Sequence, residues 1–211
     1  RVNKQPPSFT WQAILDEKMP KLGMEPIRRA ALVKATIDEI GANGSLDVTV
    51  SQIAKRAGMS SALAHHYFGG KEQIFLAAMR HTLSVYAAEV RGALIMADTP
   101  RERLEAIIRA GFGTSNFRRE VIAAWLNFYV LAQTSSEAKR LLTIYQRRLH
   151  ANLMFNLRPL LGDDAQDAAY RIGGLIDGIY LREALTITKT SSKAATKHVL
   201  AALDLELGKT K

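Results

Sequence analysis

The 211-residue sequence contains no cysteine. This absence excludes a disulfide framework and any metal site built on thiolates. The sequence also lacks an apolar run near the roughly 18 residues that a membrane-spanning helix requires, and its first residues have no apolar signal-peptide region. We therefore expect a cytoplasmic protein with no membrane partner.

Residues with catalytic chemistry are also sparse. His81, His150 and His198 are isolated in the sequence and have no metal-ligand spacing. Gly111-Phe112-Gly113 lacks the preceding strand and the further glycine that a dinucleotide loop needs, and Asp163-Asp164 suits a helix cap better than a general-acid pair. We expect no catalytic residue, no metal and no cofactor. An enzyme on a helical bundle is the alternative of another class, and it would require a pocket with a metal or paired titratable groups.

Positive charge is in excess, because 29 lysines and arginines outnumber 20 acidic residues and give a net charge of +9. Basic proteins favour anionic partners, of which nucleic acid is the usual one. The excess is spread along the chain, with +4 in the first 81 residues and +5 in the remaining 130. The charge therefore supports a nucleic-acid partner without locating its site.

Apolar residues recur at helical spacing along most of the chain, and no segment shows the alternation of a strand. Pro26 suits the first turn of a helix, whereas Pro159 and Gly162 are expected to break one. The pattern predicts an all-α protein. The predicted helices lie at about residues 26–40, 50–57, 61–67, 71–95, 100–111, 118–133, 136–157, 163–186 and 192–208.

The segment from Thr49 to Lys71 predicts two short helices joined by a tight turn. Thr49 and Gln52 have the spacing of a capping box, Gly58 allows a chain reversal, and Ser60 can cap the second helix. In a helix-turn-helix motif the second helix lies in the major groove of DNA. The alternative is an ordinary helical hairpin, in which the serines only cap helices.

Side chains in and near this motif can bond phosphates or base edges, and small residues let the backbone approach DNA. The candidates for DNA contact are Arg28, Thr49, Ser51, Ser60, Ser61, Ala62, Leu63, His65, His66, Tyr67 and Lys71. The expected partner is a double-stranded DNA operator. A DNA-architectural protein without an effector is a further alternative, and it would show a steep salt dependence and no preferred sequence.

The run from Lys34 to Met79 resembles the N-terminal domain of TetR-family repressors. The residues that carry the resemblance include Val48-Thr49-Val50, Ile53-Ala54, Ala57-Gly58 and His66-Tyr67-Phe68. Further motifs resemble the choline-responsive BetI-type branch of that family, namely Met19 to Met24, Ile27-Arg28-Arg29, Ala124-Trp125-Leu126 and Leu175 to Gly178.

The resemblance covers most of residues 19–211 and implies a domain organisation. We expect a three-helix helix-turn-helix domain at residues 21–70, followed by a six-helix effector-binding and dimerisation domain at residues 71–211. Residues 1–20 are expected to form a poorly ordered leader unless their apolar side chains dock on the protein. The long helix at residues 71–95 is the expected lever between the two domains.

An aromatic cluster with one carboxylate stands out in the second half of the chain. Trp125, Phe128 and Tyr129 are close together on one predicted helix, and Asp177 and Tyr180 are three residues apart on another. Aromatic faces and a negative charge can hold a quaternary ammonium, which has no N–H to donate. The alternative is plain core packing. The resemblance implies that these five residues line a pocket for choline or a related cation, in a repressor that regulates glycine betaine synthesis; an unrelated small effector is the alternative.

A homodimer is expected, because a palindromic operator requires two recognition helices about 34 Å apart. Gly173, Gly174 and Gly178 would allow close helix approach in the last two long helices. The alternative is that the apolar stripes of these helices form an intrachain core. The stripe residues are Ile172, Leu175, Ile176, Ile179, Leu200, Leu203 and Leu207.

Overall fold

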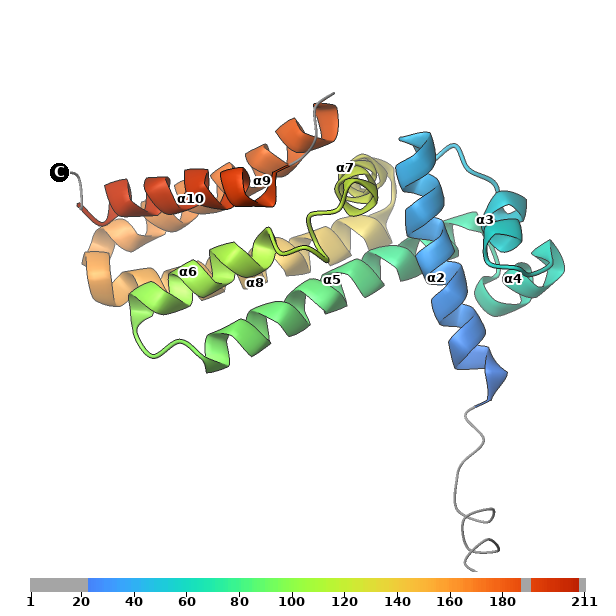
Figure 1. Ribbon diagram of the computed structural model, residues 1–211, viewed down its shortest axis with the longest axis horizontal. Coiled ribbons are helices and arrows are strands. Elements are labelled where there is room, and N and C mark those ends of the chain that lie inside the picture. Colours follow the sequence, from blue (N-terminus) through green and yellow to red (C-terminus); the bar gives the residue numbers. More distant parts are fainter. Residues whose placement is uncertain (1–22, 187–190, 209–211) are drawn as a thin grey trace, which may run out of the picture.

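The computed structural model describes residues 23–186 and 191–208, which form helices and no strand (Figure 1). This confirms the all-α prediction. The leader predicted at residues 1–20 lies outside the described residues. The helices are α2 (Met24–Asn43), α3 (Val50–Arg56), α4 (Ser61–Phe68), α5 (Lys71–Ile95), α6 (Pro100–Gly111), α7 (Arg119–Thr134), α8 (Ser136–Leu161), the short 3-10 helix η1 (Gly162–Asp164), α9 (Ala165–Leu185) and α10 (Ser192–Glu206).

Helices α3, α4 and α6 begin at residues whose side chains cap the first turn, as their sequence spacing predicts. The Thr49 hydroxyl accepts a bond from the Gln52 N–H at 3.1 Å, and the Gln52 side chain accepts one from the Thr49 N–H at 2.6 Å. Thr99 and Glu102 form the same reciprocal pair at the start of α6. Ser60 caps α4 by accepting a bond from the Leu63 N–H at 3.2 Å. Each bond satisfies an amide that the first turn of a helix leaves free.

Two predicted helix boundaries were wrong, and both lie between α8 and α9. Pro159 does not break α8, which continues to Leu161. Because Pro159 is in the last turn, its missing N–H removes a single bond there. Asp163 does not cap the following helix. Instead η1 passes directly into α9, and its backbone bond from the Ala165 N–H to the Gly162 carbonyl replaces a side-chain cap.

The short helices α3 and α4 lie at one end of the molecule, and α2 separates them from the long helices (Figure 1). We call α2, α3 and α4 the reading head. Both α5 and α7 contact α2. One continuous hydrophobic cluster extends from Ile53 in α3 through Met79 in α5 to Leu203 in α10. The reading head is therefore packed onto the rest of the chain rather than tethered to it.

The apolar stripes predicted for a dimer interface lie mainly inside the subunit. Ile172, Ile176 and Ile179 of α9 and Leu203 of α10 are buried within the single chain. Leu175, Leu200 and Leu207 are partly buried against the same core. For the four buried residues the alternative of an intrachain core is correct, because α9 packs on α7, α8 and α10. The dimer itself stays a prediction.

Candidate functional site

Helix α4 has one face accessible to solvent. Ala64 is the only residue of α4 that is buried, whereas Ala62, His65 and His66 are exposed and Leu63 is half-buried. The C-terminal end of α4 binds part of its own chain, since His65 Nδ1 lies 3.0 Å from the Gly69 carbonyl oxygen. The exposed face of α4 is thus available to a groove of DNA.

The turn before α4 sets its orientation relative to α3. Gly58 has φ +69°, a conformation that an L-residue adopts only with strain. The Met59 N–H donates to the Ala54 carbonyl at 2.9 Å across this turn. The hydroxyls of Ser51 and Ser61 lie 2.7 Å apart and join the starts of the two helices. Two of the predicted DNA contacts therefore also hold the motif together.

Arg28 and Tyr67, both predicted to contact DNA, touch each other. Arg28 donates to the Tyr67 hydroxyl at 3.5 Å, and both side chains are half-buried. The guanidinium of Arg29 lies 5.4 Å from the centre of the Tyr67 ring and 5.1 Å from that of Phe68. These contacts brace the C-terminal half of α4 against α2, so Tyr67 has a structural role whatever else it binds.

Cations in the reading head and at the adjoining start of α5 differ in how they are paired. Arg56 is bound by Glu39 at 2.9 Å, and this hydrogen bond raises the pKa of the guanidinium. Lys55 and Lys71 are exposed and form no ion pair with any described residue. Lys55 shares a shallow hollow with Ser51, Gln52, Ser60 and Ser61 at the start of α4. Lys55 was not among the predicted DNA contacts, and its exposed place on the polar face of α3 makes it a further candidate.

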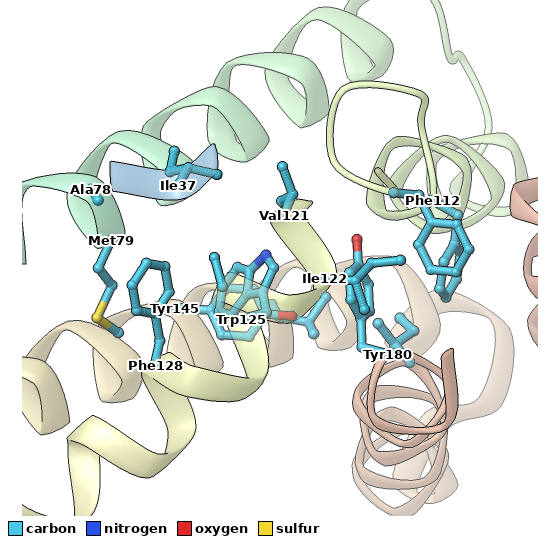
Figure 2. Packing of buried hydrophobic residues seen from close by; sticks show 14 of the residues in the cluster. Ile37, Ala78, Met79, Phe112, Val121, Ile122, Trp125, Phe128, Tyr145 and Tyr180 are labelled. Atoms are coloured by element: carbon cyan, nitrogen blue, oxygen red, sulfur yellow. The ribbon is translucent and has the colours of Figure 1, made fainter. Parts of the chain in front are cut away.

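The second site is a set of aromatic rings contributed by four helices. We define the aromatic cage as Tyr86 of α5, Trp125 and Tyr129 of α7, Tyr145 of α8 and Tyr180 of α9. The ring centre of Trp125 lies 4.9 Å from that of Tyr145, 6.1 Å from that of Tyr129 and 6.4 Å from that of Tyr180. Tyr86 meets Tyr145 edge-on at 5.7 Å. Trp125 thus neighbours three of the other four rings, and in Figure 2 it lies between Tyr145 and Tyr180.

Asp177 supplies the negative charge beside the cage. Its Oδ1 accepts hydrogen bonds from the hydroxyls of Tyr129 at 3.1 Å and Tyr145 at 3.4 Å. Burial raises the pKa of Asp177, and the two tyrosine hydrogen bonds partly oppose that shift. No arginine, lysine or histidine of the described residues forms an ion pair with it. A half-buried carboxylate without a cation is costly, and a bound cation would reduce that cost.

The cage is nearly closed in this structure. The cavity that its five rings line, together with Gly111, Asn116 and Ile176, measures about 10 Å³. Such a space holds at most one water molecule. Any larger ligand must therefore displace side chains.

The structure differs from the sequence prediction in which aromatic residues face this cavity. Of the five residues predicted to line a ligand pocket, Trp125, Tyr129 and Tyr180 line this cavity. Asp177 does not line it, but accepts hydrogen bonds from two tyrosines that do. Phe128 does not line it; this side chain is fully buried, and in Figure 2 it lies toward Met79. Tyr86 and Tyr145 complete the wall and were not among the predicted residues, because their helices approach α7 only in the tertiary structure. The Tyr180 hydroxyl also donates to the carbonyl of Gly111, which lines the same cavity.

No described residues combine into a metal centre of three or more histidine, aspartate or glutamate side chains. None of the described helices has the length and apolarity to span a membrane.

Comparisons with known proteins identify the family. The family of BetI-type transcriptional repressors, C-terminal domain, matches residues 100–208, and the bacterial regulatory proteins of the tetR family match residues 32–78. The HTH-type transcriptional regulator BetI of Brucella anthropi is 54% identical over 168 residues, which are 79% of this chain and 87% of the relative. The chain belongs to the TetR family, in its BetI-type branch. It is a transcriptional repressor by family and not an enzyme.

One further relative and two solved structures are also similar to this BetI-type repressor. The BetI regulator of Agrobacterium fabrum is 48% identical over 190 residues, which are 90% of this chain and 92% of the relative. A regulator of Pseudomonas aeruginosa PAO1 has the same fold, with a TM-score of 0.74 and 26% identity over 92% of this chain and 96% of its own. A Saccharomonospora viridis regulator solved in complex with choline superposes with a TM-score of 0.75, at 21% identity, over 83% of this chain and 95% of its own.

In this BetI-type repressor, α7 carries the centre of the cage and also contacts the reading head. Gly41 of α2 packs so closely on α7 that an added Cβ would lie 2.5 Å from the Glu120 Cα. Asn127 is buried and donates to the Gly44 carbonyl at the end of α2 at 3.4 Å. The helix expected to be the lever, at residues 71–95, is α5. The structure places α7 beside it as a second direct connection between cage and head (Figure 1).

Proposed function

We propose that this BetI-type regulator is a homodimeric, one-component repressor that binds a palindromic operator through α4 and responds to choline or a related quaternary ammonium. It would act in the cytoplasm and control glycine betaine synthesis from choline. The observation that carries the ligand assignment is Asp177, which forms no ion pair with a described cation and is hydrogen-bonded to two of the five aromatic rings that line the cavity.

The chemistry of the cage suits a quaternary ammonium better than a protonated amine. A trimethylammonium group has no N–H, so it gains nothing from hydrogen-bond acceptors and is held by the faces of aromatic rings at about 0.5–2 kcal/mol per contact. The Asp177 carboxylate adds a net negative charge at the edge of these rings. A cation in the cage favours the ionised form of Asp177, so the pKa of this carboxyl should fall on binding.

Binding requires a rearrangement that can affect the reading head. The cavity of about 10 Å³ must expand, and a cation near Asp177 competes with the hydroxyls of Tyr129 and Tyr145. Trp125 and Tyr129 belong to α7, which also contacts α2 through Glu120 and Gly41. An effector can shift DNA affinity only if it binds two arrangements unequally, and displacement of α7 would provide such a difference.

For DNA binding, we assign the base and phosphate contacts to the exposed face of α4 and the residues around it. His66 is exposed on α4, and Lys71 and Lys55 are exposed on either side of that helix. Thr49, Ser60 and Ser61 are also at the surface or partly so, but their hydroxyls take part in capping or in the Ser51 contact. We keep the predicted division into a DNA-binding domain at residues 21–70 and an effector-binding and dimerisation domain at residues 71–211.

The proposed dimer interface uses the other face of α9. Tyr170, Gly174, Leu181 and Leu185 are exposed and are spaced by four, seven and four residues, which places them on one face of the helix. Leu205 adds an exposed apolar side chain on α10, with 62% of its surface accessible. An apolar stripe of this kind loses its contact with water when two copies pair.

The relatives support the ligand class. Proteins named BetI share 48–54% identity with this chain over most of its length, and the Saccharomonospora viridis protein of the same fold was solved with choline.

A thermal-shift and calorimetric comparison of three compounds tests the assignment. Choline should raise the melting temperature of the full chain, because a ligand that binds only the folded state stabilises it by about 2.7 kcal/mol at a hundred times its Kd. Ethanolamine lacks the methyl groups, and the uncharged analogue with carbon in place of nitrogen lacks the charge, so both should shift it much less. Equal shifts with choline and the uncharged analogue would contradict an electrostatic role for the cage.

A further inference from the structure

A groove between α5 and α8 adjoins the aromatic cage. Its volume is about 650 Å³, and Tyr86 and Tyr145 line both the groove and the cage cavity. These two rings, which meet edge-on at 5.7 Å, are therefore the partition between the two spaces. If the partition opens, the small inner cavity and the large groove become one site.

The groove is positively charged, and a positive charge does not help to bind free choline, which is itself a cation. Three arginines line it, namely Arg80, Arg91 and Arg148, and none of its described lining residues is acidic. Arg80 is paired with Glu137 at 3.3 Å. Arg91 and Arg148 are exposed and form no ion pair with any described residue. The groove thus carries positive charge and attracts anions, whereas the adjoining cage is proposed to bind a cation.

We propose that the groove is the second half of the effector site and binds the phosphate of a phosphorylated choline whose trimethylammonium group enters the cage. This inference rests on the proposed function of the cage. Such a ligand carries a positive ammonium group and a negative phosphate a few bonds apart. The two adjoining spaces carry the complementary charges, since the Asp177 carboxylate lies beside the cage and arginines line the groove. Free choline would fill only the inner space.

Helix α8 places the two recognition elements on one face. Tyr145 and Arg148 are three residues apart, so their side chains are neighbours on the helix surface. A guanidinium can bind a phosphate through two parallel N–H donors. Opening the partition also separates the Tyr145 hydroxyl from Asp177, which frees that carboxylate for the ammonium group. One ring movement would therefore prepare both halves of the site.

Calorimetric titration of the full chain with choline, phosphocholine and inorganic phosphate tests the inference. We expect phosphocholine to bind about five- to tenfold more tightly than choline, which corresponds to one charge-assisted contact at a partly exposed site. Inorganic phosphate should show no binding at the same concentrations. Phosphocholine that binds no more tightly than choline, or phosphate that binds as tightly as phosphocholine, would overturn the proposal.

Two arginine variants on α8 sharpen the test. Arg148→Ala should remove the advantage of phosphocholine and leave the affinity for choline within twofold. Arg147→Ala is the matched control, because Arg147 is exposed on the same helix but does not line the groove, and it should change neither affinity. Equal losses for both ligands in Arg148→Ala would contradict a phosphate contact. If wild-type protein binds choline but does not favour phosphocholine, only the groove fails; if it binds neither ligand, the cage itself fails.

Discussion

The reading head and the aromatic cage are built in opposite ways. The candidate DNA contacts from Ser60 to Lys71 are nearly contiguous in the sequence and lie mostly at the surface. The cage collects its rings from four helices between Tyr86 and Tyr180, and its cavity is almost completely filled. A protein surface that binds a rigid, anionic DNA duplex can have its final conformation before the DNA binds. The cavity of the cage has to open before a ligand larger than one water molecule can enter, and that opening is available as a signal.

The largest difference between the two regions should appear with Asp177→Asn. The substitution keeps an oxygen that accepts from Tyr129 and Tyr145 but removes the charge. Loss of one partner of a buried charge pair costs 2–5 kcal/mol or more, so choline affinity should fall about a hundredfold. Operator affinity without ligand should not change. Calorimetry measures the first quantity and fluorescence anisotropy of labelled operator the second.

Asp167→Asn is the matched control, because Asp167 is exposed on the same helix. It should bind choline like the wild type. If Asp177→Asn also binds choline with wild-type affinity, the carboxylate is not part of the ligand site.

Gly41→Ala tests the contact that joins the two regions. The new Cβ would lie 2.5 Å from the Glu120 Cα, so α2 and α7 must move apart. We expect a loss of about 1–3 kcal/mol in the free energy of unfolding, as for other overpacked interfaces, and a weaker effect of choline on operator affinity. Denaturant unfolding and anisotropy measure these two effects.

Gly92→Ala provides the comparison, since a Cβ there meets no atom within 4 Å. In the interior of α5 this change should stabilise the protein by about 0.5–1 kcal/mol. Similar destabilisation in both variants would show that the close approach of Gly41 to Glu120 is not the cause of the loss in stability.

His66→Ala and Lys71→Ala should affect only DNA binding. Each should weaken operator binding by about 1–3 kcal/mol and leave choline affinity and stability unchanged. For Lys71→Ala the salt dependence of binding should also become shallower by about one phosphate contact. His81→Ala, an exposed histidine farther along α5, is the control. Undiminished operator affinity in gel-shift titrations of both variants would remove these residues from the DNA face.

The smallest expected effect is a pH dependence of stability at the cage. Burial raises the pKa of Asp177 in the folded state, so its ionised form is less favourable there than in the unfolded chain. The stabilising contribution of the neutral carboxyl is complete below the ordinary aspartate pKa and is lost as pH rises through the raised value. Relative to wild type, Asp177→Asn should therefore gain stability between about pH 4 and neutral pH. Denaturant unfolding of both proteins across this range should show a widening gap, and a constant gap would contradict the assignment.

The sequence predicted best what depends on neighbours along the chain. The capping pairs Thr49 with Gln52 and Thr99 with Glu102 form as expected, because each involves atoms only three residues apart. The turn at Gly58 likewise needs only the conformational freedom of that residue. These local interactions define the helix-turn-helix motif, so its exposed residues could be named before the structure was available.

What the sequence could not predict depends on contacts between distant helices. In the sequence, Tyr86 is one member of the apolar repeat of α5 and has no feature that marks it as a cage residue. It reaches Tyr145 because α5 packs against α8. Phe128 is adjacent to Tyr129 in the sequence, but it points into the core rather than the cage. Ile172 and Ile176 were assigned to a partner subunit, although they pack inside their own chain. Helical periodicity shows that a face is apolar and does not show what covers it.

The most direct test of the account is reciprocal binding at the cage and the reading head. A palindromic duplex selected by the protein from a randomised DNA pool can be titrated with and without saturating choline, and choline can be titrated onto free and DNA-bound protein. The account predicts that choline changes operator affinity by about 5–150-fold and that the operator changes choline affinity by the same factor. Superimposable operator curves with and without choline, in protein that demonstrably binds it, would contradict the coupling of the aromatic cage to the reading head.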